Sequence, residues 1–172
     1  MKIAHIFLTY VQNILKAMKG GKYMKVKECM CNELCCVNSN TKIWEVAKLM
    51  GDNHVGSVLI SNADNKICGI VTDRDITLRG VANKKDFEQT PISDIMTTKV
   101  CTCDEEDEVC DAQDTMSEYQ IRRLPVCDCN NNLVGIITTG NLAQNSKELG
   151  QKEVTKTFEN ICQCKKNQRN AE

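Results

Sequence analysis

The sequence has few residues that loosen a chain or interrupt its regular structure. It contains two prolines and nine glycines in 172 residues, and this composition argues against long disordered linkers. No hydrophobic run is long enough to span a bilayer. The net charge is −1, with no basic block before the tail, so the charge pattern of a nucleic-acid-binding protein is absent. We therefore expect neither a membrane span nor a nucleic-acid partner.

Residues and motifs that support catalysis are also scarce. The chain has two histidines, no Ser-His-Asp arrangement, and neither a GxGxxG nor a P-loop string. We therefore expect a protein that is not an enzyme. The apolar fraction of 41% and the charged fraction of 26% are ordinary for a globular protein. The length predicts one domain, or two half-domains that share a core.

Cysteine, by contrast, is abundant, with twelve residues. The N-terminal apolar stretch is broken by His5 and Thr9 and lacks a small-residue cleavage site, so it is a poor signal peptide. We expect a cytoplasmic protein with reduced thiols. Many of the cysteines stand close together in the sequence. Four pairs have C-x-C spacing, Cys29/Cys31, Cys101/Cys103, Cys127/Cys129 and Cys162/Cys164, and Cys35 and Cys36 are adjacent.

Three interpretations of these cysteines stay open. Thiolates bind soft metals, but structural zinc sites usually have C-x₂₋₄-C spacing, which C-x-C matches poorly. Thiol redox sensing is the second interpretation. The third is that cysteine serves as an ordinary small residue in a reducing cytosol. None of the cysteines is therefore predicted to be a metal ligand.

An internal repeat organises most of the chain. Residues 69–76 match residues 135–142, and Gly69 aligns with Gly135, 66 positions later. The same offset pairs Met30 with Met96, Cys35 with Cys101, Ile43 with Val109, Val46 with Ala112, Met50 with Met116 and Ile60 with Val126. Each unit is too small to bury a good core alone. We expect the two units to pack face to face, with a ligand site at their interface.

The repeat divides the chain into five predicted segments. They are a leader (1–25), repeat 1 (26–80), a polar linker (81–91), repeat 2 (92–146), and a C-terminal helix with a charged tail (147–172). Each repeat is predicted to be β-α-β-β-α, which makes an α/β (α+β) fold. Predicted strands are 34–37, 55–60, 66–72, 100–103, 121–126 and 133–138; predicted helices begin at Thr41, Asp73, Asp107 and Thr139. Val154, Phe158 and Ile161 predict the C-terminal amphipathic helix.

The leader allows two interpretations. Its apolar residues recur at helical spacing and predict an amphipathic helix for docking or for a membrane surface. Alternatively, residues 19–24 back-translate to a purine-rich tract just before a start codon, as in a mistranslated ribosome-binding site. In that case the protein starts at Met24.

A strand-to-helix motif carries the clearest chemistry. Gly69, Thr72 and Asp75 stand where a predicted strand ends and a helix begins. The backbone N–H groups of a first helical turn suit an anion, and a nearby Asp can accept hydrogen bonds from ribose hydroxyls. The simpler interpretation is that Thr72 is an N-cap and Asp75 complements the helix dipole. The pattern returns as Gly135, Thr138 and Asn141.

With these motifs, the region 26–146 resembles a pair of CBS domains, the tandem arrangement called a Bateman module, in a small stand-alone bacterial protein. The resemblance rests on Gly69-Ile-Val-Thr-Asp-Arg-Asp-Ile, on Ile121-Arg-Arg-Leu-Pro-Val and on the β-α-β-β-α order. It implies a regulatory sensor that binds AMP, ADP, ATP or S-adenosylmethionine in clefts between the repeats and modulates a partner protein. The adenosine compound would be a regulatory ligand, and no further cofactor is expected. The implied ligand-binding residues are Gly69, Thr72, Asp75, Thr138 and Asn141.

The second repeat departs from this pattern. Asn141 replaces the acid, so it can bond a ribose only without charge assistance. Arg122 and Arg123 occur only in the second repeat, and the resemblance assigns them to nucleotide phosphates. Alternation along a strand predicts that at least one of the two points to solvent. His54 opens the corresponding strand and is a further candidate ligand residue.

The family resemblance also implies a homodimer. Apolar helix positions such as Val109, Ala112 and Met116 are expected to leave a face for a second subunit. Two other functions remain open at this stage: a cysteine-based metal or redox module, and a dimerising scaffold that binds no ligand.

Overall fold

The computed structural model describes residues 24–163. The predicted leader helix and the charged tail from residue 164 lie outside the described residues, as does the second cysteine of the last C-x-C pair. Among residues 24–163, no helix has the length and apolar character needed to cross a membrane.

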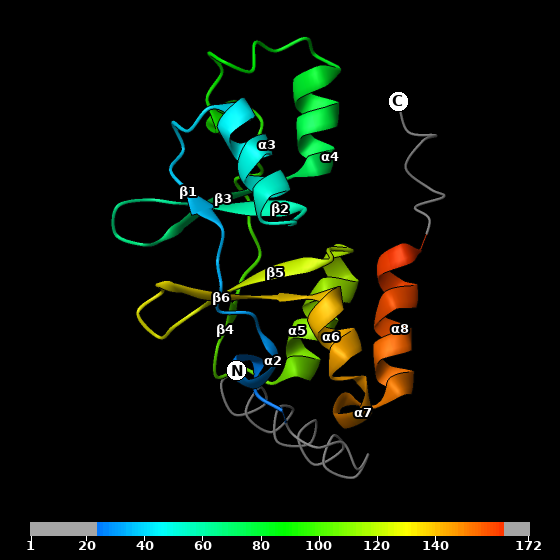
Figure 1. The fold of residues 1–172 in the computed structure, drawn as a ribbon. Coiled ribbons are helices and arrows are strands. Elements are labelled where there is room, and N and C mark those ends of the chain that lie inside the picture. The colour runs from blue at the N-terminus through cyan, green and yellow to red at the C-terminus, as the bar shows by residue number, and fades with distance from the viewer. Residues whose placement is uncertain (1–23, 164–172) are drawn as a thin grey trace, which may run out of the picture.

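Two three-stranded sheets face each other at the centre of the molecule, and helices cover their outer faces (Figure 1). In the first half, β1 (Cys36–Val37) runs parallel to β2 (Ser57–Ser61), which pairs antiparallel with β3 (Ile67–Thr72). In the second half, β4 (Cys103–Asp104), β5 (Arg123–Cys127) and β6 (Leu133–Thr138) repeat this order. The predicted mixed α/β fold is therefore confirmed.

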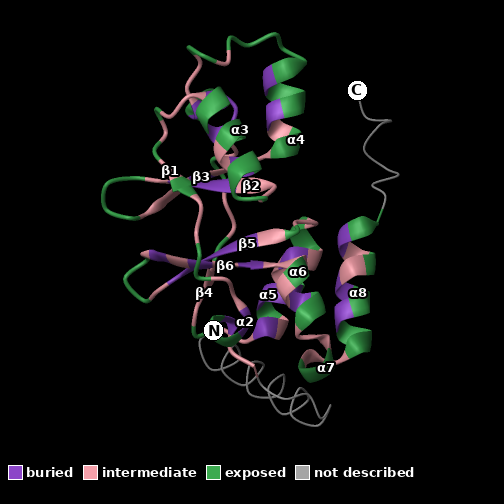
Figure 2. Ribbon diagram, in the orientation of Figure 1, coloured by how far each residue is buried: buried purple, intermediate pink, exposed green. Residues whose placement is uncertain are grey.

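The helices also correspond between the halves. The first half has α3 (Ile43–Asp52), then α4 (Asp73–Asp75), which continues as the π-helix η1 (Ile76–Val81). The second half has α5 (Val109–Tyr119), α6 (Thr139–Gln144), α7 (Ser146–Leu149) and α8 (Gln151–Cys162). Two short helices, α2 (Val26–Cys29) and η2 (Ile92–Asp94), open the first and second repeat. The apolar stripes of α3 and α5 are buried (Figure 2), as their helical spacing predicts.

Some predicted boundaries are wrong. The predicted strand 34–37 is reduced to β1, and the predicted strand 100–103 overlaps β4 only at Cys103, because the residues just before β1 and β4 run as an open connection between the halves. Thr41 does not cap α3, since the N-cap position is occupied by Lys42, whose backbone N–H donates to Glu45 Oε2 at 2.9 Å.

The leading segment of each repeat packs into the opposite half. Val26 and Cys29 of α2 are buried in the core of the second half, and Ile92 of η2 is buried in the core of the first. Cys31 forms an antiparallel bridge with Ile136 of β6. The equivalent bridge joins Thr97 to Ile70 of β3. The folded halves are therefore not the two sequence repeats, because each half borrows its leading segment from the other.

The helix α8 packs on α5, as the C-terminal amphipathic pattern predicts. Val154 and Ile161 are buried, and the buried Gln113 side chain donates to Thr157 Oγ1 at 3.2 Å. This packing corrects the argument for a dimer face on α5. Val109, Ala112 and Met116 are buried within the protomer, because their stripe faces the core of the second half.

The exchanged packing depends on glycines in the last strand of each half. A Cβ at Gly69 would lie 2.6 Å from Met96 Sδ. We predict that Gly69→Ala destabilises the protein by about 1–3 kcal/mol through overpacking. Met96→Ala in the same chain removes the nearest atoms, so the double variant should lose less stability than the sum of the single variants. Urea unfolding measures all three; simple additivity would contradict this packing.

Candidate functional site

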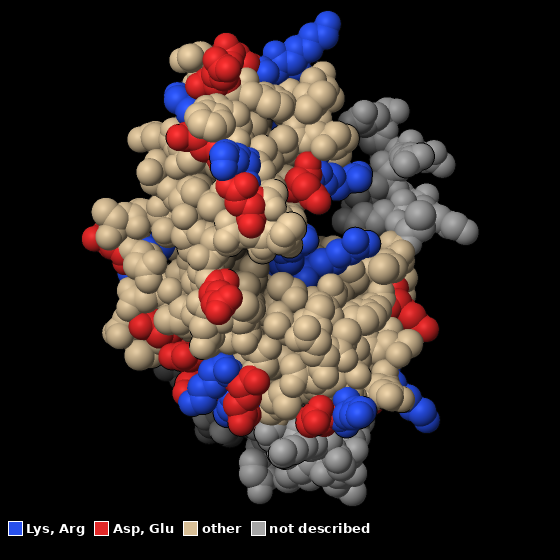
Figure 3. All heavy atoms as spheres, viewed as in Figure 1, with Lys and Arg blue, Asp and Glu red and all other residues tan. Residues whose placement is uncertain are grey.

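A cleft of about 540 Å³ lies between the two halves. The hollow is visible from outside, with basic side chains beside it (Figure 3). It is built from the 31–35 connection, the start of β2, the start of β5 and the β6–α6 junction. Its lining residues are Cys31, Glu33, Leu34, Cys35, Val55, Gly56, Ser57, Leu59, Asp73, Arg122, Arg123, Ile136, Thr138, Thr139, Gly140 and Asn141.

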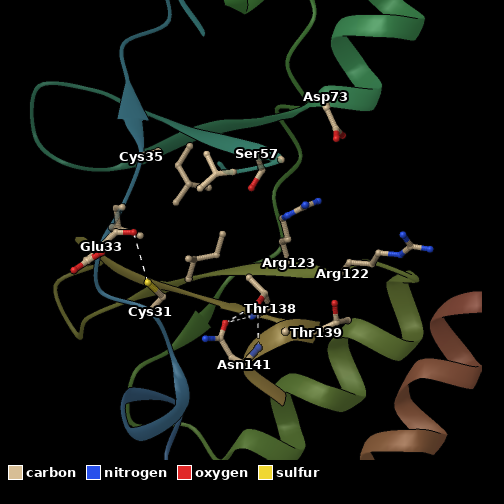
Figure 4. Close-up of a pocket in the computed structure, with 16 residues that line it drawn as sticks. Cys31, Glu33, Cys35, Ser57, Asp73, Arg122, Arg123, Thr138, Thr139 and Asn141 are labelled. Atoms are coloured by element: carbon tan, nitrogen blue, oxygen red, sulfur yellow. Dashed lines mark hydrogen bonds between the residues drawn. The ribbon is translucent and has the colours of Figure 1, made fainter. Parts of the chain in front are cut away.

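The β6–α6 junction brings a hydroxyl and an amide to the cleft wall (Figure 4). Thr138 Oγ1 donates to Asn141 Oδ1 at 2.6 Å, and the Asn141 backbone N–H donates back to Thr138 Oγ1 at 3.2 Å. The Thr138 backbone N–H also donates to Asn141 Oδ1, at 2.9 Å. The capping interpretation of the motif is thus confirmed here, and the caps hold the two side chains in fixed positions.

The same capping arrangement forms in the first half. Thr72 Oγ1 donates to Asp75 Oδ2 at 2.7 Å, and the Asp75 backbone N–H donates to Thr72 Oγ1 at 3.2 Å. Asp75 also lies 3.4 Å from the Arg79 guanidinium. Both motifs therefore have the same geometry, although Thr72 and Asp75 are not among the residues that line the cleft.

Two arginines enter the cleft from the start of β5. Arg122 is exposed and Arg123 is half-buried, which fits the expectation that at least one points to solvent. Arg123 extends over Gly56 and toward Asp73 (Figure 4): a Cβ at Gly56 would lie 2.8 Å from Arg123 Nη2 and 3.3 Å from Asp73 Oδ2. Within residues 24–163 neither arginine forms an ion pair. Both cations are thus available to an anionic group.

The predicted ligand residues fall into two groups. Arg122, Arg123, Thr138 and Asn141 line the cleft together. Gly69, Thr72, Asp75 and His54 do not line it: Gly69 is buried against Met96, and His54 is exposed just beyond α3. Ligand contact by any of the eight residues stays a prediction.

The sequence did not predict that the connection 31–35 forms one wall of the cleft. The connection from Cys31 to Cys35 reaches it only because Cys31 pairs with Ile136 in the other half. Asp73, the first residue of α4, also lines the cleft. The 66-residue offset aligns the two repeats, but it does not show that the leading segment of each repeat packs into the opposite half.

Burial keeps two of the thiols, Cys29 and Cys103, protonated near neutral pH. Burial raises the pKa of the Cys103 thiol to about 12, and burial also raises the pKa of Cys29 to about 11. A thiol is nucleophilic only as the thiolate. Cys29 and Cys103 are therefore expected to be inert near neutral pH.

Few side chains are grouped closely enough to bind a metal ion in the part of the chain that the structure describes. One group of three potential ligands occurs there, formed by Glu108, Cys110 and Asp111, whose ligand atoms lie within 4.8 Å of one another. The C-x-C pairs do not converge on a shared set of three ligands among these residues. Exposed acidic groups of this kind are common without a metal.

These pKa values predict an order of alkylation. At pH 8 iodoacetamide should modify the exposed Cys129 and Cys162 well before Cys29 and Cys103, because the raised pKa values keep the latter two protonated. Their rates should rise as the pH approaches their pKa values, provided that the fold persists. Peptide mass spectrometry measures the order; early labelling of Cys103 in folded protein would contradict the assignment.

Comparison with known proteins agrees with this architecture. The CBS domain family model matches residues 26–80 and 92–148. The chain belongs to the CBS domain family. The CBS domain-containing protein YhcV of Bacillus subtilis (strain 168) is 40% identical over 120 residues, covering 70% of this chain and 84% of YhcV. The predicted family is thus confirmed.

Two solved CBS structures have similar folds and bound adenosine compounds. The CBS domain pair of protein MJ0100, in complex with 5′-methylthioadenosine and S-adenosyl-L-methionine, has a TM-score of 0.65 and 30% identity, covering 72% of this chain and 95% of that one. The CBS domain protein PAE2072 of Pyrobaculum aerophilum, complexed with AMP, has a TM-score of 0.67 and 25% identity. The match covers 77% of this chain and 99% of PAE2072.

Proposed function

We propose that this chain is a regulatory module that binds an adenosine compound in the cleft between its halves. In this role the chain is a sensor and not an enzyme. Ligand binding would favour one of two states of the module, and a partner protein would respond to that state. The CBS relatives that hold AMP, or methylthioadenosine and S-adenosylmethionine, support the ligand class.

One observation carries the proposal. The capped Thr138–Asn141 junction and the arginine pair line the same cleft. The junction offers a hydroxyl and an amide of suitable chemistry for a ribose. The arginines offer two cations that form no ion pair within residues 24–163, and guanidinium groups match phosphate geometry. We therefore propose that AMP, ADP or ATP binds here in preference to an adenosine compound without phosphate.

The arginine pair provides the test. The double variant Arg122→Ala/Arg123→Ala should bind AMP about 10–100-fold more weakly, because charge-assisted hydrogen bonds contribute about 1.5–3 kcal/mol. Its affinity for adenosine should stay unchanged. Calorimetric titration with AMP and adenosine measures both.

Lys147→Ala is the matched control, since Lys147 is an exposed cation on α7 outside the cleft. It should bind AMP like the unmodified protein. If the unmodified protein binds adenosine as tightly as AMP, the arginines do not bind phosphate and the nucleotide preference is wrong.

A cysteine-based metal module is the second candidate function. The grouping of Glu108, Cys110 and Asp111 favours it, although four-coordinate structural zinc needs one more ligand. Metal analysis of protein purified without oxygen separates the two candidates. A stoichiometric metal without nucleotide binding would favour this second function.

A further inference from the structure

The cleft between the two halves carries fixed charges of both signs. Two of its lining residues are basic, Arg122 and Arg123, and two are acidic, Glu33 and Asp73. The arginines stand at the start of β5 in the second half, whereas Asp73 begins α4 of the first half. No other charged side chain is among the described residues that line the cleft. Asp73 and Arg123 thus approach each other from opposite halves (Figure 4).

The carboxylate of Asp73 is held in place beside Arg123. Its Oδ1 accepts a hydrogen bond from the Arg74 backbone N–H at 2.7 Å, which fixes the direction of the group. Its Oδ2 and the Nη2 of Arg123 both lie within 3.3 Å of the point that a Cβ would occupy at Gly56. Among residues 24–163 the two groups form no ion pair. Arg123 is therefore near the Asp73 charge and still has N–H groups to offer to a phosphate.

The fold does not require an acid at position 73. The equivalent residue of the second half, 66 positions later, is Thr139, and it also lines the cleft. The backbone N–H of Asp73 donates to the Gly56 carbonyl at 3.4 Å, and that of Thr139 donates to the Arg122 carbonyl at 3.1 Å. The two residues therefore hold the same place in their halves, and a neutral side chain is sufficient in one of them. The charge of Asp73 thus belongs to the cleft and not to the capping motif.

These charges limit how many phosphate groups the cleft can hold. A phosphate monoester has a charge of about −2 at pH 7, which the two arginines balance. Each further phosphate group adds negative charge, and the described lining residues offer no third cation. A phosphate chain that stays in contact with Arg123 also approaches the Asp73 carboxylate, and like charges at short range repel each other.

We propose that Asp73 determines the specificity of the cleft, restricting it to adenosine compounds with a single phosphate group by repelling a longer phosphate chain. The inference rests on the proposed nucleotide binding and narrows its ligand class from AMP, ADP or ATP to the monophosphate. Glu33 does not share this role, because it lies at the opposite end of the cleft from Arg122 and Arg123 (Figure 4).

The variant Asp73→Asn tests the proposal, since it removes the charge and keeps the size of the side chain. Calorimetric titration with AMP and with ATP, both without divalent cations, measures the two affinities. The unmodified protein should bind AMP about tenfold more tightly than ATP. In Asp73→Asn the affinity for ATP should rise more than the affinity for AMP, because ATP carries more negative charge. The preference for AMP should therefore largely disappear.

Two further acid-to-amide variants are the matched controls. Glu33→Gln removes a charge from the far end of the cleft and should change the affinities for AMP and ATP by similar factors. Asp64→Asn removes an exposed charge outside the cleft and should leave both affinities unchanged. Circular dichroism shows whether each variant is folded.

Three results would overturn this inference alone. They are equal affinities of the unmodified protein for AMP and ATP, an unchanged AMP preference in Asp73→Asn, and an equal loss of preference in Glu33→Gln. In each case both nucleotides still bind, so the proposed function stands. If the unmodified protein binds neither nucleotide, the proposed function is wrong and this inference is wrong with it.

Discussion

The close packing of a methionine on a glycine, made once in each half, underlies the whole arrangement. Met96 lies against Gly69 of β3, and Met30 lies against Gly135 of β6. Glycine is required because any side chain there would occupy the volume of the methionine sulfur. Both contacts fix a leading segment onto the opposite half. Neither half therefore has a complete core without a segment of the other repeat, and the two halves fold as one unit.

This exchange also builds the cleft. Once Cys31 pairs with Ile136, the connection that follows must return to β1 in the first half, and it lines the space between the sheets on the way. The cleft wall is thus a consequence of chain connectivity. Ligand binding between the halves would contact segments of both repeats, which is a physical route for a ligand to change their relative placement.

Small departures from the repeat give the two halves different chemistry. Arg122 and Arg123 replace Gly56 and Ser57, and the Arg123 side chain packs against Gly56, where a Cβ would lie 2.8 Å from its Nη2. Asn141 replaces Asp75 without changing the capping hydrogen bonds. Among residues 24–163, α8 packs on α5 of the second half, whereas Ala47 at the equivalent position of α3 is exposed. A nearly symmetric scaffold thereby gains one basic cleft wall and one exposed helix face.

Much of this could be predicted from the sequence, since apolar periodicity and the 66-residue offset depend on local residues. The helix from Thr139 and the strand 133–138 lie where the pattern places them. The segment exchange, the role of Cys31 to Cys35 and the packing of Met116 within its own protomer could not be predicted, because each depends on which distant segment packs alongside.

The central claim is that an adenosine compound occupies the cleft formed by the exchanged segment. Cys31 and Cys35 line that cleft, whereas the exposed Cys129 lies outside it. Alkylation of folded protein with and without saturating AMP, followed residue by residue by mass spectrometry, tests the claim. Bound AMP should slow the labelling of Cys31 and Cys35 and leave the rate at Cys129 unchanged. Equal rates at all three cysteines would contradict it.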